Sequence, residues 1–118
     1  MGGLLGGTAE SNGSEPSELL VEGAFLDGPF VPFLSRSDVE RAHRAAMTAF
    51  EGLPSGQTKI WRNPENGHWG TLTPARTYQN AEGRYCREYR QTVTIGGQEH
   101  QANGAVCRRG DGVWQVIS

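Results

Sequence analysis

The middle of the chain carries one helical pattern of apolar residues. Ser37 followed by Glu40 fits a capping box, in which the two side chains satisfy the backbone amides at the start of a helix. Gly52 and then Pro54 are typical of a helix end. The sequence therefore predicts a helix over residues 38–51, with one apolar stripe formed at spacings of three and four by Val39, Ala42, Ala46 and Phe50.

After this helix, the pattern changes to short β-rich runs separated by turn residues. Pro74 interrupts one of these runs and predicts an edge or a bulge there. The patterns together predict an α+β fold, in which one N-terminal helix packs on an antiparallel β-meander of about four to five strands. The predicted strands are residues 57–62, 68–78, 85–95, the segment after Gly97, and 113–117.

The centre of this meander is a long hairpin with a turn at Gly96-Gly97, since a Gly-Gly pair suits a turn that needs positive φ. Cys86 and Cys107 each lie ten residues from their side of the turn, so they should face each other directly. Counting along the ladder makes them a non-hydrogen-bonded pair, whose Cα atoms approach to about 4.5 Å. That distance lies within the range of a disulfide. The sequence predicts a Cys86–Cys107 disulfide across the two strands.

Side chains of a strand alternate between its two faces, which assigns the residues of 85–95 to two sets. The set expected to cover the helix is Tyr85, Tyr89, Val93 and Ile95. The set expected on the outer, more polar face with the disulfide is Cys86, Glu88, Arg90 and Thr92.

The first third of the chain has a different character. Residues 1–18 have the glycine-rich composition of a flexible segment, and residues 35–118 form the predicted domain. Between them, residues 19–34 are the most apolar stretch, although their Gly and Pro residues exclude a regular helix. We predict an extended arm that either packs onto the domain or recruits a partner or a second copy of the chain. The candidate interaction residues of this arm are Leu20, Phe25, Phe30 and Phe33.

Composition limits the compartment and the partners. The 118 residues are 36% hydrophobic and carry a formal net charge of −2, so nucleic acid is not expected as a partner. Two cysteines placed opposite each other favour an oxidising compartment outside the cytoplasm. No signal-peptide pattern and no long apolar run are visible, and we expect that the native export signal is missing from this sequence.

Several motifs of the second half resemble those of a known family. They are W-x-N-P-x-x-G, T-P-x-R-T-Y, G-x-Y-C-R-E-Y and A-V-C-R-x-x-D-G-x-W. Their combination over residues 55–118 resembles the C-terminal domain of the bacterial surface-antigen outer-membrane lipoproteins of the rickettsial common-antigen type. The resemblance implies the outer membrane or periplasm of a Gram-negative bacterium and no established enzymatic chemistry.

The resemblance also gives the N-terminal segment a possible origin. Such lipoproteins carry a glycine-zipper segment, and GGLLGG at residues 2–7 looks like its last turn. The lipidated cysteine of that family has no counterpart here, and the arm at residues 19–34 is not part of the family pattern. Outer-membrane or other cell-envelope components are the implied partners.

Aromatic and cationic residues offer one candidate binding surface, to which a glycan or peptide could bind. In a small sheet, tryptophans more often pack in the core, and that alternative is favoured. The residues of the candidate surface are Trp61, Trp69, Tyr78, Arg84, Arg87, Arg90 and Trp114.

Catalytic and metal chemistry find little support in the sequence. His43, His68 and His100 are widely separated and no motif links them to a nucleophile, so we expect solvated or partly packed histidines, no enzyme, no cofactor and no metal site. Two functions remain. The first is a non-enzymatic cell-envelope protein with a structural or interaction role. The second is a soluble periplasmic binding or inhibitor module that recognises a glycan or an envelope protein.

Overall fold

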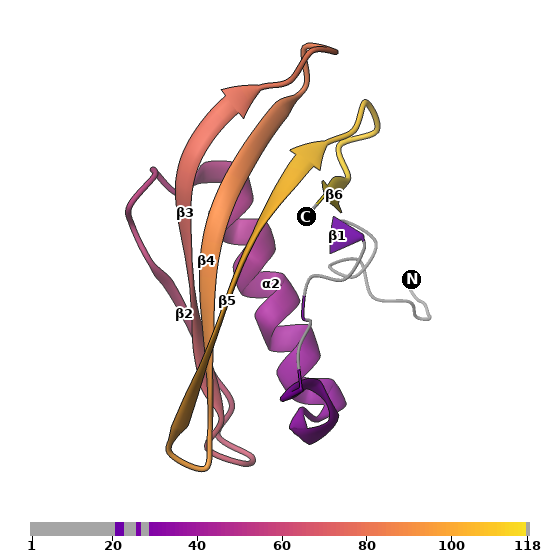
Figure 1. The fold of residues 1–118 in the computed structure, drawn as a ribbon. Coiled ribbons are helices and arrows are strands. Elements are labelled where there is room, and N and C mark those ends of the chain that lie inside the picture. Colours follow the sequence, from indigo (N-terminus) through magenta and orange to yellow (C-terminus); the bar gives the residue numbers. More distant parts are fainter. Residues whose placement is uncertain (1–20, 23–25, 27–28, 118) are drawn as a thin grey trace.

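The computed structural model describes residues 21–22, 26 and 29–117, and it places one helix against one face of a sheet (Figure 1). The elements are β1 (Val21–Glu22), η1 (Val31–Phe33), α2 (Arg36–Gly52), β2 (Lys59–Arg62), β3 (Trp69–Gln79), β4 (Tyr85–Ile95), β5 (Gln98–Arg108) and β6 (Trp114–Val116). Within the described ranges, no helix has the length and apolar character needed to cross a bilayer.

The strand order β1-β6-β5-β4-β3-β2 confirms the predicted antiparallel meander, which comprises β2 to β6. The two residues of β1 add a short parallel strand beside β6, within the segment predicted as an extended arm. Pro74 lies at a register shift between β3 and β4, so the predicted interruption is a bulge. The fold class predicted from the sequence is therefore confirmed.

The central hairpin has the predicted register. Gly96 and Gly97 both have positive φ, of 58° and 79°, and Ile95 pairs with Gln98 beside the turn. The ladder then runs without a shift to Cys86, which pairs with Cys107. The two cysteines form the predicted disulfide, with their Cα atoms 4.0 Å apart.

The helix begins two residues earlier than predicted, at a different capping box. Ser35, not Ser37, is the N-cap: its hydroxyl accepts the Asp38 amide at 3.0 Å, and the Asp38 carboxylate accepts the Ser35 amide at 2.8 Å. The predicted pair of Ser37 and Glu40 therefore does not cap the helix. An aspartate at the third helical position serves the capping role that the sequence pattern assigned to glutamate.

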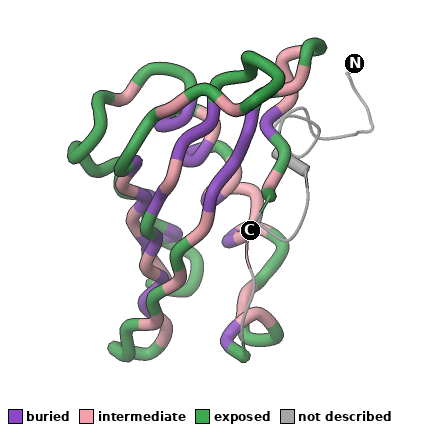
Figure 2. The backbone as a smooth tube through the Cα atoms, turned by 45° about the horizontal axis from the view of Figure 1, so that its top comes forward, coloured by how far each residue is buried: buried purple, intermediate pink, exposed green. Residues whose placement is uncertain are grey.

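The core lies between α2 and the sheet, where buried residues follow most of β4, the first half of β3 and the last part of β5, and most loop residues are exposed (Figure 2). One half of it centres on Phe50, whose ring lies 5.4 Å from that of Tyr89 and 5.6 Å from that of Trp114. The other half packs Phe30 and Trp61 with Val93 and two helix alanines. Gly70 is required beside Trp61, because a Cβ there would lie 2.5 Å from the indole nitrogen.

The predicted faces of β4 are correct in the middle of the strand and wrong at one end. Tyr89 and Val93 are buried under α2, whereas Tyr85 is 59% exposed because the strand extends past the helix there. The disulfide lies on the face away from α2, as predicted, but it is not on an exposed surface. Cys86 is fully buried, and the side-chain amide of Asn80, in the turn after β3, lies 4.0 Å from the sulfur of Cys107.

Removing the disulfide is expected to lower the free energy of unfolding by roughly 3 kcal/mol, because it closes a loop between residues 21 apart in sequence. The measurement is a urea titration of the Cys86→Ser, Cys107→Ser variant against the oxidised protein. Adding reductant should lower the midpoint of the native protein and leave that of the variant unchanged. Thiol alkylation of the folded, unreduced protein would contradict the bond.

Candidate binding face

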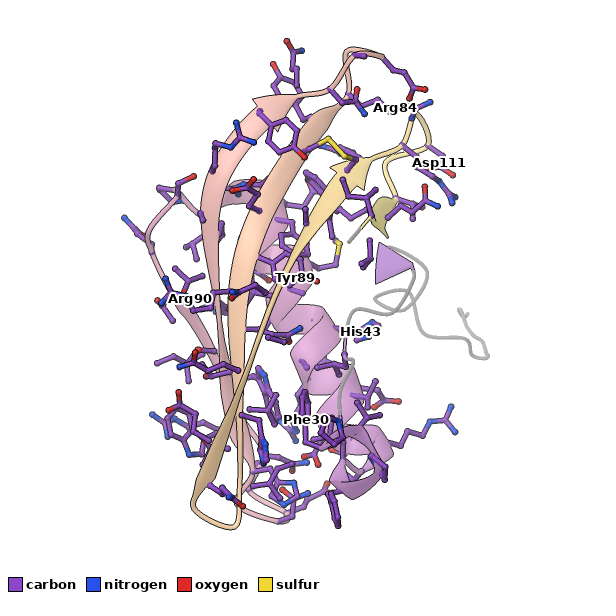
Figure 3. All side chains as sticks on the ribbon, in the orientation of Figure 1. Phe30, His43, Arg84, Tyr89, Arg90 and Asp111 are labelled. Atoms are coloured by element: carbon purple, nitrogen blue, oxygen red, sulfur yellow. A yellow bond between two sulfur atoms is a disulfide. The ribbon has the colours of Figure 1, made fainter. Side chains whose placement is uncertain are left out.

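The face of the sheet opposite α2 is covered by no helix within the described ranges (Figure 1). It is polar along most of its area, because the strands alternate buried and exposed side chains. Figure 3 shows Arg90 on this side of the sheet, away from α2, whereas Phe30 lies between the sheet and the helix. We call this surface the outer face. The side chains that define it are Trp69, Thr71, Thr73, Tyr78, Glu88, Arg90, Thr92, Gln101 and Asn103.

Hydroxyl groups link the strands across the outer face. The hydroxyl oxygens of Thr71 on β3 and Thr92 on β4 lie 2.6 Å apart. Those of Thr58, just before β2, and Thr73 on β3 lie 2.7 Å apart. These pairs place hydroxyl groups on the outer face. Cross-strand threonine pairs of this kind stabilise a sheet modestly and do not need a covering layer.

Both aromatic residues of the outer face carry an arginine above the ring. Arg62 lies 5.9 Å from the ring centre of Trp69, and Arg76 lies 4.4 Å from that of Tyr78. Arg76 also forms an ion pair with Glu88 at 3.1 Å. These cation–π contacts fix the guanidinium groups on the surface at little cost in solvation.

A shallow groove of about 750 Å³ crosses the outer face between the loop before β2 and β5. Its side chains provide hydroxyl, guanidinium, carboxylate and amide groups from Thr58, Thr73, Arg90, Glu88 and Asn103. Such a set can donate and accept hydrogen bonds along a polar ligand.

The structure separates the three tryptophans of the candidate surface, and two of them pack in the core, which is the alternative that the sequence favoured. Trp61 and Trp114 are on the helix side and buried, with exposed fractions of 7% and 3%. The indole nitrogen of Trp114 donates to Glu51 at the end of α2 at 2.9 Å. Only Trp69 and Tyr78 remain on the outer face. The period of two explains the difference, because Trp61 pairs with Gly70 and therefore faces opposite to Trp69.

The predicted arginine cluster is also divided. Arg90 is exposed on the outer face, and Arg84 lies at the far end of the sheet near Asp111, where it pairs with Glu82 at 3.4 Å (Figure 3). Arg87 is 7% exposed and faces α2, so it is not part of any binding surface.

Arg87 instead ties the sheet to the end of the helix. Its guanidinium donates to the carbonyl oxygens of Ala49 at 2.9 Å and Phe50 at 3.2 Å, and to the hydroxyl of Thr77 at 2.9 Å. Burial lowers the pKa of Arg87 below its ordinary value. The Ala49 carbonyl also accepts the backbone amide of Leu53 at 3.0 Å, and carbonyl groups at a helix end generally have spare acceptor capacity. A cation is favoured there by the helix dipole. Arg87 supplies both the donors and the charge.

Asp38 forms the corresponding anchor at the start of the helix. Its fully buried carboxylate accepts hydrogen bonds from Asn63 at 2.7 Å, from Asn66 at 3.1 Å and from the ring of His68 at 2.8 Å. Burial alone would raise the pKa of Asp38, but these contacts and the Ser35 amide outweigh it and lower the pKa to about 2. The turn between β2 and β3, with its Asn-Pro-x-x-Gly motif, is thus bound to the helix.

The three histidines lie apart, and the described residues hold no group of His, Cys, Asp and Glu that could bind a metal ion. His68 contacts Asp38, and His100 stacks on Phe30 with ring centres 5.3 Å apart. His43 is half-buried on α2.

The predicted arm is divided between the core and the surface. Phe30 is 5% exposed and belongs to the core, whereas Phe33 is 68% exposed. Leu20 and Phe25 lie outside the described residues. The arm therefore packs onto the domain at Phe30, and a role of Phe33 in self-association stays a prediction.

Comparison with known proteins agrees with the sequence motifs. The family described as 17 kDa outer membrane surface antigen matches residues 48–115. The chain is 46% identical over 85 residues to the 17 kDa surface antigen of Rickettsia bellii, across 72% of this chain and 54% of that protein. With the proteins of that name from Rickettsia felis and Rickettsia prowazekii it shares 47% identity over 85 residues and 51% over 73 residues.

The chain spans about half the length of these curated relatives, since the matched regions cover 54% of the first two and 46% of the third. No solved structure matches the chain.

Proposed function

Because the chain belongs to the family of 17 kDa outer membrane surface antigens, we propose that it is a non-enzymatic protein of the cell envelope that binds another envelope component. The description of the family as outer membrane surface antigens supports a location at the outer membrane or cell surface. The observation that carries the proposal is the asymmetry of the sheet: α2 covers one face, and the outer face keeps Trp69, Tyr78 and Arg90 available.

The reactive side chains support a binding role over catalysis. Both cysteines are joined in the disulfide, and His68 is held by a buried carboxylate that also caps the helix. A general base must reach a substrate proton, and His100 is stacked against Phe30 instead. These groups contribute to the fold.

The outer face favours an anionic, hydroxyl-rich glycan of the envelope as its ligand. Arg62 and Arg90 have no carboxylate partner among the described residues, and the threonines and Asn103 can bond to sugar hydroxyl groups. Guanidinium groups are well suited to phosphate and carboxylate because they donate in pairs. The proposed ligand is lipopolysaccharide, an envelope glycan that carries phosphate groups as well as sugar hydroxyls.

The test is co-sedimentation with vesicles that contain lipopolysaccharide and, separately, with purified peptidoglycan. An Arg62→Glu, Arg90→Glu variant should bind the vesicles about tenfold more weakly, corresponding to roughly 1.4 kcal/mol. The matched control is Arg36→Glu, Arg44→Glu on the exposed side of α2, which makes the same change in net charge. Equal losses in both variants, or no binding to vesicles, would overturn the choice of ligand and face.

The second candidate, a soluble periplasmic binding or inhibitor module, could use the same face and is compatible with the small disulfide-closed domain. Fractionation of the full-length gene product separates the two candidates. Firm association with the membrane fraction is expected of an envelope-anchored protein, and release with the periplasm is expected of a soluble module.

A further inference from the structure

One edge of the sheet is open along the hairpin end of β5. β6 pairs with β5 only from Val106 to Arg108, and the amide of Ile117 adds one bond to the carbonyl of Ala105. Residues 98–104 therefore have no neighbouring strand on this side within the described part of the chain (Figure 1). On its other side, β5 pairs with β4 without a register shift from Gln98 to Cys107, so no bulge distorts the strand.

The ladder fixes which backbone groups point outward from this edge. Ile95 and Gln98 are the hydrogen-bonded pair beside the turn, and pair types alternate from there. The amides and carbonyls of residues 98, 100 and 102 consequently bond to β4. Those of Glu99, Gln101 and Asn103 point away from β4, as the bond between Ile117 and Ala105 shows for the next residue of this series.

Edge strands usually carry features that prevent pairing with another chain, such as short length, lysine, proline or a bulge. The opposite edge of the sheet has two of them, because β2 is only four residues long and carries Lys59 and Arg62. Residues 98–104 contain no lysine, no proline and no register shift. The open edge of β5 is thus a competent template for an added strand.

We propose that a second copy of this chain pairs with the edge, antiparallel and centred on Gln101. In that register Gln101 faces Gln101 of the other copy, and Glu99 faces Asn103, whose amide can donate to the carboxylate. The alternative register centred on Glu99 would place two carboxylates together, which is unfavourable. Six backbone hydrogen bonds join the copies in the proposed register, two for each facing pair.

The other face of the strand fits the same register. His100 faces Ala102 and Gln98 faces Gly104, so each large side chain lies opposite a small one. Pairing stops at Ala105, where Ile117 occupies the edge. The outer faces of the two copies become one continuous surface. This inference concerns assembly and does not depend on which ligand the outer face binds.

The test is the solution mass of the full chain, measured by sedimentation over a range of concentrations up to roughly millimolar, where weak association becomes visible. The native protein should move from 12.8 kDa toward twice that mass. Gln101→Pro should remain monomeric, because proline removes an amide that only the second copy uses. Gln101→Thr keeps the backbone groups and should dimerise like the native chain.

Gln101→Lys provides a second variant with an unaltered backbone. It places two ammonium groups next to each other across the symmetry axis, so this variant should also be monomeric. If circular dichroism shows that Gln101→Pro does not fold, Gln101→Lys alone tests the pairing of the two strands. A native protein that stays monomeric throughout would overturn the proposal. Dimers that persist in Gln101→Lys but disappear in Phe33→Ser would also overturn it and assign self-association to the arm.

Discussion

Replacing Arg87 with alanine is expected to lower the free energy of unfolding by about 4 kcal/mol. The buried guanidinium donates to the carbonyls of Ala49 and Phe50 and to the hydroxyl of Thr77. Hydrogen bonds that involve a charged group contribute roughly 1.5–3 kcal/mol each, and deletion also leaves a cavity between sheet and helix. The change should be visible as a lower midpoint in a urea titration monitored by circular dichroism.

Two controls separate the role of Arg87 from a general effect of arginine. Arg90→Ala, three residues along β4 and exposed on the outer face, should change stability by less than about 0.5 kcal/mol. Arg87→Lys keeps the charge but lacks the planar set of donors, so an intermediate loss is expected. Equal stability of Arg87→Ala and Arg90→Ala would show that the helix end does not depend on Arg87.

The hairpin could be predicted from the sequence because its determinants are local. A Gly-Gly turn fixes the register of everything that follows it, and Cys86 and Cys107 test that register independently. The same rule placed Tyr89 and Val93 under the helix. The free edge of β5 was not predicted, because the length of the pairing with β6 depends on the path of the chain after the turn at residues 110–112.

The role of Arg87 could have been suspected from alternation alone, since residue 87 shares the face of Tyr89. The residue type argued against a buried position for Arg87, because arginines are mostly exposed to solvent. The sequence does not show which groups accept hydrogen bonds from Arg87. The carbonyls of Ala49 and Phe50 belong to the end of a helix distant in sequence, and only the fold brings them to the strand.

The helix start illustrates a choice between two similar local signals. Both Ser35 with Asp38 and Ser37 with Glu40 have a serine three residues before an acidic side chain. The pair of Ser35 and Asp38 forms the cap in the structure, because Asp38 also has partners outside the helix. These are Asn63, Asn66 and His68 from the turn between β2 and β3. Tertiary contacts therefore decided an ambiguity that local sequence could not.

Those contacts make Asp38 the second position at which a large effect is expected. Asp38→Ala should lower the free energy of unfolding by about 4 kcal/mol, since each buried donor that loses its acceptor costs roughly 1–3 kcal/mol and several donors depend on this carboxylate. The loss includes the helix cap and the bonds that hold the turn. Ser37→Ala, on the same helical turn but with weaker contacts of 3.2 Å and 3.4 Å, is the matched control and should lose less than about 1 kcal/mol.

Acid titration gives a separate test of the same carboxylate. The pKa of Asp38 is lowered from 3.8 to about 2 in the folded protein, so the ionised group stabilises the fold fully above pH 4. This contribution, about 2 kcal/mol, should be lost as the pH falls from 4 to 2. Asp38→Asn cannot titrate, so its stability deficit against the native protein should shrink over that interval. Asp111, whose pKa is also lowered to about 2, titrates in both proteins and cancels in the comparison. A deficit that stays constant from pH 6 to pH 2 would show that the carboxylate is not held as the structure describes.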